Sequence, residues 1–336
     1  MSSTPTPSTP STHVKTRFLI LSDTHSSEPS QNTNNDAPYR SPLPKADVLL
    51  HCGDLTMLGH FDEYERTLNM LESIDAELKL VIAGNHDISL DETYYKRMGR
   101  HMQGKRFDAD MPRGAREMWM GERARKAGVT YLEEGRYTFK LGNGARLGVW
   151  ASPYQPEFCD YAFPYQRNED RYNPPHQCSP GATPIAENPV PDWQENEGID
   201  VIMTHGPPMG ILDAVQNGEH VGCEHLLRAV RRCRPRLHCF GHIHEGWGAQ
   251  RVEWAEGEQL DVKPEEHFKG ADAMEVDRQR MEDGRAAFVD ISHGGDNAIA
   301  FGRETLMVNA SIMSVTYKPV QGPWLVDMDL EKAPVN

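Results

Sequence analysis

Short apolar runs alternate with polar segments along the first ninety residues of the chain. Runs of strand length that end in small or polar residues span 16–22, 47–52 and 78–83. Between the second and the third run, the apolar residues Phe61, Tyr64, Leu68 and Leu71 recur at the spacing of one helical face. The order strand, strand, helix, strand predicts an α/β start with parallel pairing.

The remaining chain continues with the same two kinds of pattern. Further strands are predicted at 199–204, 237–240, 286–291, 305–310 and 324–328, and helices at 113–127 and 223–232. A hairpin is predicted over 137–150, because a Gly-Asn-Gly turn at 142–144 separates its two halves. Mixed strands and helices over this length predict one large α/β domain.

Several segments lack a periodic pattern, and we expect them to lie outside the regular elements. Residues 1–14 are rich in Ser, Thr and Pro and are predicted as a disordered tail ahead of a single domain at 15–330. Insertions in that domain are expected near 26–45, 152–197 and 255–285. The segment 152–197 is rich in proline and aromatic residues, which favours an ordered lid over a solvated linker.

Composition and charge narrow the classes of function. Of the 336 residues, 38% are hydrophobic and 25% are charged, as in a globular soluble protein. The formal net charge of −15 disfavours a general binder of nucleic acid or of anionic membranes, which needs a basic surface. No apolar run approaches the length of about 18 residues that spans a membrane. The N-terminus lacks the apolar core of a secretory signal, and six scattered cysteines predict reduced thiols in a cytoplasmic protein.

Residue types that bind metals follow five of the predicted strands directly. The clusters are Asp23-Thr24-His25, Gly53-Asp54, Gly84-Asn85-His86-Asp87, His205-Gly206-Pro207-Pro208 and Gly241-His242-Ile243-His244. Any one of them could be an ordinary polar turn. Because the carboxyl ends of strands in an open α/β sheet line one crevice, five such turns would deliver their side chains to one place. Together they predict a shared site.

The order D-x-H, G-D, G-N-H-D, H-G and G-H-x-H resembles the calcineurin-like metallophosphoesterase superfamily. The likeness is greatest to its metallophosphoesterase-domain-containing branch, often described as cyclic-nucleotide phosphodiesterase-like. Supporting strings are LSDTH, LLHCGDLT, IAGNHD, ASPYQPEFC, THGPP, GCEHLL, LHCFGHIHEGWG and VNAS, within about residues 16–328. The resemblance implies the calcineurin-like metallophosphoesterase sandwich, an α/β fold of two packed mixed β-sheets flanked by helices.

Mixed carboxylate and imidazole donors suit manganese, iron or zinc more than calcium. Seven candidate side chains are too many for one ion with an open position. The resemblance implies two divalent ions, with manganese expected first and iron, zinc or magnesium as alternatives. It implies that Asp23, His25, Asp54 and His244 bind one ion, and that Asp54, Asn85, His205 and His242 bind the other. Every expected position is present, which argues against a metal-free relative.

The hypothesis for the reaction is in-line attack on phosphorus by a hydroxide that bridges the two ions. The resemblance makes His86 the group that protonates the leaving oxygen. Asp87 would orient His86, or alternatively would cap a helix at 90–98. His51 is expected to be a packed histidine or one that supports a ligand, and Cys52 a buried apolar side chain.

We therefore expect a metal-dependent phosphodiesterase that acts on small esters, cyclic nucleotides among them. The alternatives are a phosphomonoesterase or a specialised-pathway enzyme on the same metal site, and a low-activity, metal-bound scaffold protein. A nuclease is disfavoured by the acidic charge balance, so no nucleic-acid polymer and no membrane are expected as partners. The lid discriminates between substrates: a closed aromatic wall suits a nucleobase, and a basic cleft suits a phosphoprotein. Only Arg167 and Arg171 are cations in this segment.

Overall fold

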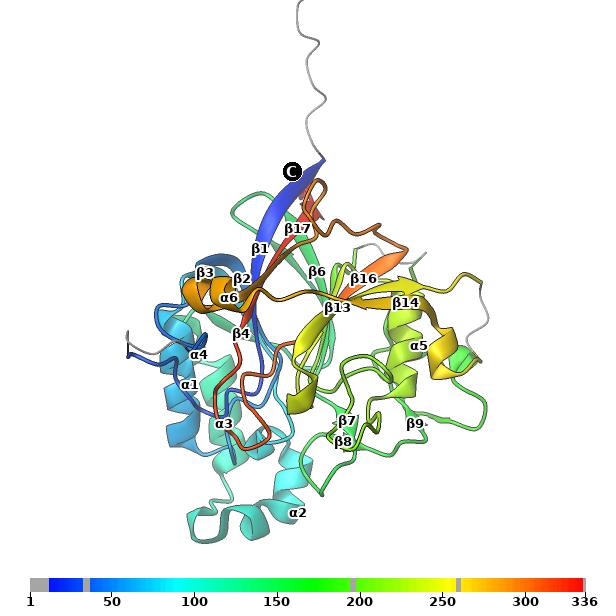
Figure 1. Cartoon of the computed structure of the whole chain (residues 1–336). Coiled ribbons are helices and arrows are strands. Elements are labelled where there is room, and N and C mark those ends of the chain that lie inside the picture. The colour runs from blue at the N-terminus through cyan, green and yellow to red at the C-terminus, as the bar shows by residue number, and fades with distance from the viewer. Residues whose placement is uncertain (1–11, 33–36, 194–197, 258–260, 335–336) are drawn as a thin grey trace, which may run out of the picture.

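Two β-sheets pack face to face in the computed structural model, with helices on their outer sides (Figure 1). The structure describes residues 12–32, 37–193, 198–257 and 261–334. The predicted fold class, two packed mixed sheets flanked by helices, is confirmed. Among the helices of these residues, none is long and apolar enough to cross a membrane.

The first sheet contains six strands. In spatial order they are β15 (Ala287–Asp290), β17 (Trp324–Glu331), β1 (His13–Leu21), β2 (Ala46–His51), β3 (Ala76–Val81) and β4 (Val129–Tyr131). Strands β1 to β4 are parallel to one another, as is β15 to β17, whereas β1 and β17 are antiparallel. The parallel strands therefore place the residues that follow β1, β2 and β3 at one edge.

The second sheet contains seven strands. In spatial order they are β14 (Phe268–Ala273), β13 (Gly248–Trp254), β16 (Glu304–Asn309), β12 (Leu237–Phe240), β11 (Val201–Thr204), β6 (Arg146–Ser152) and β5 (Gly135–Lys140). The central strands β16, β12, β11 and β6 are parallel, and the outer strands join antiparallel. The hairpin predicted at 137–150 is the β5–β6 pair.

The alternation of side chains along β1 shows how the layers form. Phe18 and Ile20 point into the core between the two sheets, and Leu19 and Leu21 point into the core beneath the outer helices. Successive side chains of a strand face opposite sides of its sheet. Because both faces are covered there, Phe18–Leu21 is a continuous apolar run rather than an alternating one.

Within the described ranges, six α-helices complete the layers. They are α1 (Phe61–Ser73), α2 (Glu92–Gln103), α3 (Met111–Met120), α4 (Glu122–Lys126), α5 (Glu224–Cys233) and α6 (Arg278–Gly284). Helices α1, α3 and α4 cover the outer face of the first sheet, and α5 covers that of the second (Figure 1). The helix predicted at 113–127 is wrong in its continuity, because Gly121 adopts an extended backbone and separates α3 from α4.

The segments predicted as tail and insertions differ in how much structure they carry. Strand β1 begins at His13, inside the predicted tail, and residues 1–11 lie outside the described residues. The described part of 26–45 has no helix or ladder strand, although Tyr39 is buried. The described part of 152–197 holds the short strands β7 (Gln155–Pro156), β8 (Pro164–Tyr165), β9 (Glu169–Asp170) and β10 (Thr183–Pro184) and a 3-10 turn at Pro175–Gln177. The segment 255–285 contributes β14 and α6, so it is in part an extension of the second sheet.

The loop between β2 and α1 is held by the carboxylate of Glu63. Its two oxygens accept hydrogen bonds from the backbone N–H groups of Met57 at 3.2 Å, Leu58 at 3.2 Å and His60 at 2.9 Å. His60 is the N-cap of α1, so Glu63 completes a capping box. We expect Glu63→Ala to lower the free energy of unfolding by about 2–3 kcal/mol, because three nearly buried donors lose their acceptor.

Urea unfolding followed by circular dichroism measures this loss. Glu65→Ala is the matched control, because the Glu65 carboxylate is half exposed and pairs only with Arg123 at 2.8 Å. Its loss should stay below about 1 kcal/mol. Equal losses for the two variants would contradict the role of Glu63 in the loop.

Candidate metal centre

The seven side chains predicted as metal ligands lie together where β1, β2, β3, β11 and β12 end. Asp54 is central, with its carboxylate oxygens 3.6 Å from His25 Nε2 and 3.4 Å from His205 Nε2. The Asn85 Oδ1 atom lies 2.8 Å from His205 Nε2 and 2.9 Å from His242 Nδ1. On the other side, His244 Nε2 lies 3.5 Å from Asp23 Oδ1. The structure thus brings all seven into one buried cluster.

Three groups in this cluster have donor atoms within 4.8 Å of one another. They are Asp23, His25 and His244; Asp23, Asp54 and His205; and His25, Asp54 and His86. Each group combines at least one carboxylate with at least one imidazole. This donor chemistry suits a divalent transition metal.

The hydrogen bonds of three histidine rings fix which nitrogen faces the cluster. Backbone carbonyls lie 3.0 Å (Thr56), 2.9 Å (Cys52) and 3.1 Å (Ser314) from the Nδ1 atoms of His25, His205 and His244, respectively. A carbonyl can only accept, so each Nδ1 carries the hydrogen. In the neutral rings, Nε2 then presents a lone pair toward the carboxylates. Histidine ligands of metals are oriented in this way.

Burial leaves the lone pair of His25 Nε2 without a partner among the described residues, whereas burial of His244 is outweighed by its hydrogen bond to Asp23, which raises the pKa of His244. Burial lowers the pKa of His25 to about 4 and that of His242 to about 3, so both rings are neutral at pH 7. The buried His25 Nε2 has no hydrogen-bond partner in the described part of the chain. Burial opposes ionisation of Asp54, but the neighbouring His205 and His86 outweigh it and lower the pKa of this carboxyl. Lone pairs facing carboxylates repel unless a cation lies between them, so the residues present fit divalent ions.

The backbone of the cluster is held in an uncommon conformation. Four of the seven residues have positive φ angles: Asp23 at 51°, His25 at 44°, Asp54 at 52° and His242 at 67°. Each such non-glycine residue costs on the order of 1–3 kcal/mol, and this strain is typical of functional sites. The backbone at Gly241 also lies very close to Asp23, because a Cβ atom on Gly241 would lie 2.0 Å from Asp23 Oδ2. The cluster is therefore positioned by the surrounding fold.

The Asp23 carboxylate is oriented by groups from the other sheet. It accepts hydrogen bonds from the His242 backbone N–H at 3.0 Å and from Ser311 Oγ at 2.8 Å. Ser311 follows β16, and it belongs to the VNAS string to which the sequence assigned no role. Its place after an apolar strand is the signal that could have identified it.

His86 lies beside the cluster with its ring fixed by a main-chain carbonyl. The Met57 carbonyl oxygen lies 2.9 Å from His86 Nδ1, and the His86 backbone N–H donates to Asp54 Oδ1 at 2.8 Å. The His25 ring centroid lies 4.7 Å away. The free end of the ring is therefore Nε2.

Neither predicted role of Asp87 agrees with the structure. Its buried carboxylate accepts from the backbone N–H groups of Gly84 at 2.8 Å, Leu55 at 3.1 Å and Thr56 at 3.0 Å. No hydrogen bond joins it to the His86 ring, and Met57 takes the orienting place instead. Nor does Asp87 cap the following helix, because α2 begins at Glu92 and is capped by Asp91, which accepts from the Tyr94 N–H. Asp87 instead ties the turn after β2 to the turn after β3.

Three aromatic rings from two loops lie against histidines of the site. The Tyr161 ring lies 4.4 Å from the ring of His86, and the Tyr317 ring lies 5.0 Å from that of His25. Phe158 stands edge-on to His242, with the ring centroids 5.9 Å apart. Phe158 is 58% exposed and Tyr317 45% exposed. We call Phe158, Tyr161 and Tyr317 the aromatic rim. The sequence pointed to the 152–197 segment but not to Tyr317, which lies in an irregular loop.

The part of the rim in 152–197 is tied to helix α2. Arg97 pairs with the Asp160 carboxylate at 2.7 Å, and the Tyr94 hydroxyl donates to the Asp160 carbonyl at 2.6 Å. The two cations of this segment have partners within the protein. Arg167 donates to the carbonyls of Val221 and Gly222, and Arg171 pairs with Glu134 at 2.9 Å.

Two residues beside the cluster are packed within the fold. His51 is buried, with Nε2 2.9 Å from the Thr24 hydroxyl, and burial lowers its pKa to about 3. Cys52 is fully buried in the core between the sheets. Both positions agree with their predicted roles, although the Cys52 carbonyl also orients His205.

Comparison with known proteins gives a consistent set of relatives. A family model described as calcineurin-like phosphoesterase matches residues 16–246, a span that contains all seven side chains and His86. The chain is 30% identical over 316 residues to metallophosphoesterase domain-containing protein 1 of Homo sapiens, covering 93% of this chain and 71% of that protein. A UPF0046 protein of Caenorhabditis elegans is 31% identical over 274 residues, covering 79% and 77%. Among solved structures, a phosphopantetheinyl hydrolase from Mycobacterium tuberculosis matches with 15% identity and a TM-score of 0.38, covering 71% and 86%.

Proposed function

The chain belongs to the calcineurin-like phosphoesterase family and is a metal-dependent phosphoester hydrolase, and we propose that it cleaves small phosphodiesters that carry a planar ring, cyclic nucleotides among them. The aromatic rim carries this proposal, because its three rings contact the rings of His25, His86 and His242. Exposed aromatic rings bind nucleobases by stacking. The partnered arginines of the 152–197 segment support a nucleobase over a phosphoprotein.

We propose that two divalent ions, manganese first, bind the cluster. Asp23, His25, Asp54 and His244 would hold one ion, and Asp54, Asn85, His205 and His242 the other. When bound, such ions polarise the phosphoryl oxygens and lower the pKa of water, which supplies the nucleophile. The support is that the Nε2 atoms of His25, His205 and His244 face the buried carboxylates of Asp54 and Asp23.

We propose that His86 protonates the leaving oxygen. Its Nδ1–H donates to the Met57 carbonyl, so the acid is the imidazolium, and the proton that moves is the one on Nε2. After the transfer, the Nδ1 hydrogen bond still holds the ring in place. Tyr161 packs against the His86 ring, which places a stacked base next to the leaving oxygen. Asp87 has no part in this step and acts only on the turns that carry the ligands.

The free state of all six cysteines supports the cytoplasm as the place of the protein. The substrate would then be drawn from small soluble esters.

The first test compares a cyclic nucleotide, a diester without a ring and a monoester. Chelator-treated protein would be reloaded with Mn²⁺, and kcat/KM measured for 2′,3′-cyclic AMP, glycerophosphocholine and p-nitrophenyl phosphate. We expect kcat/KM for the cyclic nucleotide to be higher by about tenfold or more, because stacking of one ring contributes about this factor. A preference for the monoester would overturn the diester proposal. Metal binding without turnover of any ester would favour the scaffold alternative.

Tyr161→Ala separates the rim from the metal chemistry. We expect it to raise KM for the cyclic nucleotide by about tenfold and to leave glycerophosphocholine within about twofold, because only the ring contact is lost. Tyr161→Phe is the matched control, since it keeps the ring and should keep KM. Equal effects on the two substrates would show that Tyr161 does not contact the base.

A further inference from the structure

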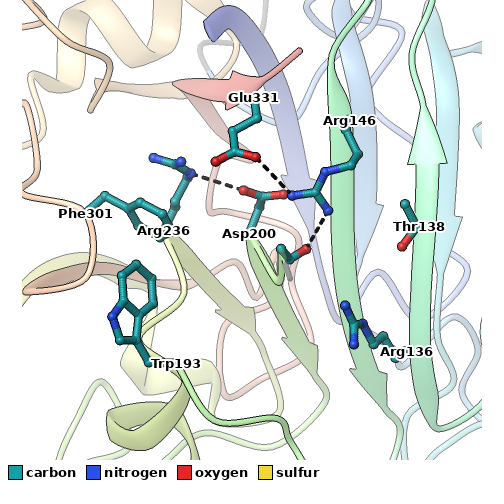
Figure 2. Close-up of a pocket in the computed structure, with 9 residues that line it drawn as sticks. Arg136, Thr138, Arg146, Trp193, Asp200, Arg236, Phe301 and Glu331 are labelled. Carbon is teal, nitrogen blue, oxygen red and sulfur yellow. Dashed lines mark hydrogen bonds and ion pairs between the residues drawn. The ribbon is translucent and has the colours of Figure 1, made fainter. Parts of the chain in front are cut away.

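A cavity lies where strands β6, β11 and β12 of the second sheet begin, and the metal centre lies beyond the other ends of β11 and β12. It has a volume of about 560 Å³ and is lined at its base by Arg146, Asp200 and Arg236 (Figure 2). These residues open or precede the parallel strands β6, β11 and β12, whereas His205 and His242 follow the far ends of β11 and β12. Asp200 and His205 are five positions apart, or roughly 16 Å along an extended strand. The cavity is therefore distinct from the cluster.

Arg236 is the central group of this cavity. It is only 8% exposed, and its Nε donates to Asp200 Oδ1 at 3.1 Å. The face of its guanidinium packs on Phe301, with the guanidinium carbon 3.5 Å from the ring centroid. Its two terminal nitrogens make no hydrogen bond to any residue that the structure describes. A buried guanidinium ordinarily uses these donors, and their fork matches two oxygens of a phosphate or carboxylate.

Two further arginines line the cavity with Arg236. Figure 2 shows Arg146 beside the carboxylates of Asp200 and Glu331, and Arg136 away from both. Arg146 donates to the Gly198 carbonyl at 3.3 Å and lies 3.5 Å from Glu331. Arg236 and Arg146 thus each face a carboxylate, and the unused terminal nitrogens of Arg236 are the donors available to an anion.

One wall of the cavity is an exposed tryptophan. Trp193 is 37% exposed and meets Phe301 edge-on, with the ring centroids 4.8 Å apart. Phe301 in turn lies under the Arg236 guanidinium. The cavity thus presents an unused pair of donors next to an aromatic face. Its volume is that of a site for a small organic ligand.

We propose that this cavity binds a small ligand of mononucleotide size, with its phosphate on the terminal nitrogens of Arg236 and its planar ring against Trp193. Binding requires no metal ion and no residue of the cluster. Strands β11 and β12 each begin at this cavity and end at a turn that carries a proposed metal ligand, His205 or His242. The proposal is independent of the proposed function.

Isothermal titration calorimetry of the full chain in a chelator tests the proposal, because metal-free protein cannot hold phosphate at the cluster through ions. The probes are adenosine 5′-monophosphate, adenosine, inorganic phosphate and benzoate. We expect adenosine 5′-monophosphate to bind about tenfold tighter than any of the other three, since each of them lacks the ring or the phosphate.

Two variants and one control locate the binding. Arg236→Lys keeps the charge beside Asp200 but loses the fork, so we expect about tenfold weaker binding of the nucleotide. Trp193→Ala should weaken nucleotide binding to a similar degree and leave phosphate unchanged. Arg113→Ala, which removes an arginine whose side chain is 75% exposed on helix α3, should change nothing.

Several results would overturn the proposal. These are no binding of the nucleotide at millimolar concentration, unchanged affinity in both Arg236→Lys and Trp193→Ala, or phosphate or benzoate binding as tightly as the nucleotide. If Arg236→Lys unfolds, the exposed Trp193 decides the outcome. Retained wild-type affinity in Trp193→Ala would then reject the site.

Discussion

Replacing Asp54 by alanine is expected to abolish phosphoester hydrolysis, with kcat/KM lowered roughly 10⁴-fold or more. Asp54 is the carboxylate shared by both proposed ions, with oxygens 3.6 Å from His25 Nε2 and 3.4 Å from His205 Nε2. Loss of the ions removes several kcal/mol of transition-state stabilisation, and each 1.36 kcal/mol is about tenfold in rate. The measurement is turnover of 2′,3′-cyclic AMP together with the metal content of the purified protein.

Thermal unfolding provides a second readout for Asp54. A ligand that binds only the folded state raises its stability, so Mn²⁺ should raise the Tm of the wild type but not that of Asp54→Ala. Asp75→Ala is the matched control, because Asp75 is a surface carboxylate paired with the exposed Lys45 at 3.1 Å. It should keep full activity and the full metal response. Metal-dependent turnover by Asp54→Ala would contradict the shared-ligand proposal.

Replacing His86 by glutamine is expected to lower kcat by about 10²–10⁴ for esters with an alkoxide leaving group. For a nitrophenyl diester the loss should be below about tenfold, because nitrophenolate departs without a proton. The Nδ1 hydrogen bond to Met57 leaves Nε2 as the only ring position that can transfer this proton. Steady-state kinetics with both kinds of ester measure the difference.

The metal content of the His86 variant distinguishes a proton donor from a metal ligand. A ring nitrogen of His86 also lies within 4.8 Å of donor atoms of His25 and Asp54, so the ring is close enough to be a ligand. If His86 is a proton donor, the His86→Gln variant should bind as much metal as the wild type. Equal losses for the two esters, together with lost metal, would make His86 a ligand instead. His101→Gln, an exposed position on α2, should leave both substrates unaffected.

The buried strands could be predicted because their chemistry is local. Strand β12 is apolar except for the buried His238, and the structure places it at Leu237–Phe240 as predicted. The predictions did not include β13, because GAQRVEW mixes apolar and polar residues and becomes a strand by pairing with β16 and β14. Strand β4 was absent from them for a related reason, since three residues are too few to carry a period. Pairing between distant segments leaves no local pattern.

The same distinction holds for the metal cluster. The five ligand turns are short sequence motifs, and the structure brings their side chains together as expected. The groups that orient them are largely main-chain carbonyls, such as those of Met57 and Thr56. A carbonyl is present in every residue and has no sequence signature. The role of Asp87 was wrong for the same reason, because its partners are the N–H groups of a turn that only the folded chain brings near.

The position of β17 has a consequence for the synthesis of the protein. This strand comes last among the strands, yet it lies between β15 and β1, and its register with β1 runs from His13↔Glu331 to Ile20↔Trp324. During translation, β1 is therefore synthesised long before β17, which is one of its two neighbouring strands. Asp23 lies just beyond β1, so the ligand made first can be fixed only when nearly everything else has been translated. A stalled or prematurely terminated nascent chain would expose the apolar edge of β1, which makes it a substrate for chaperones and proteases.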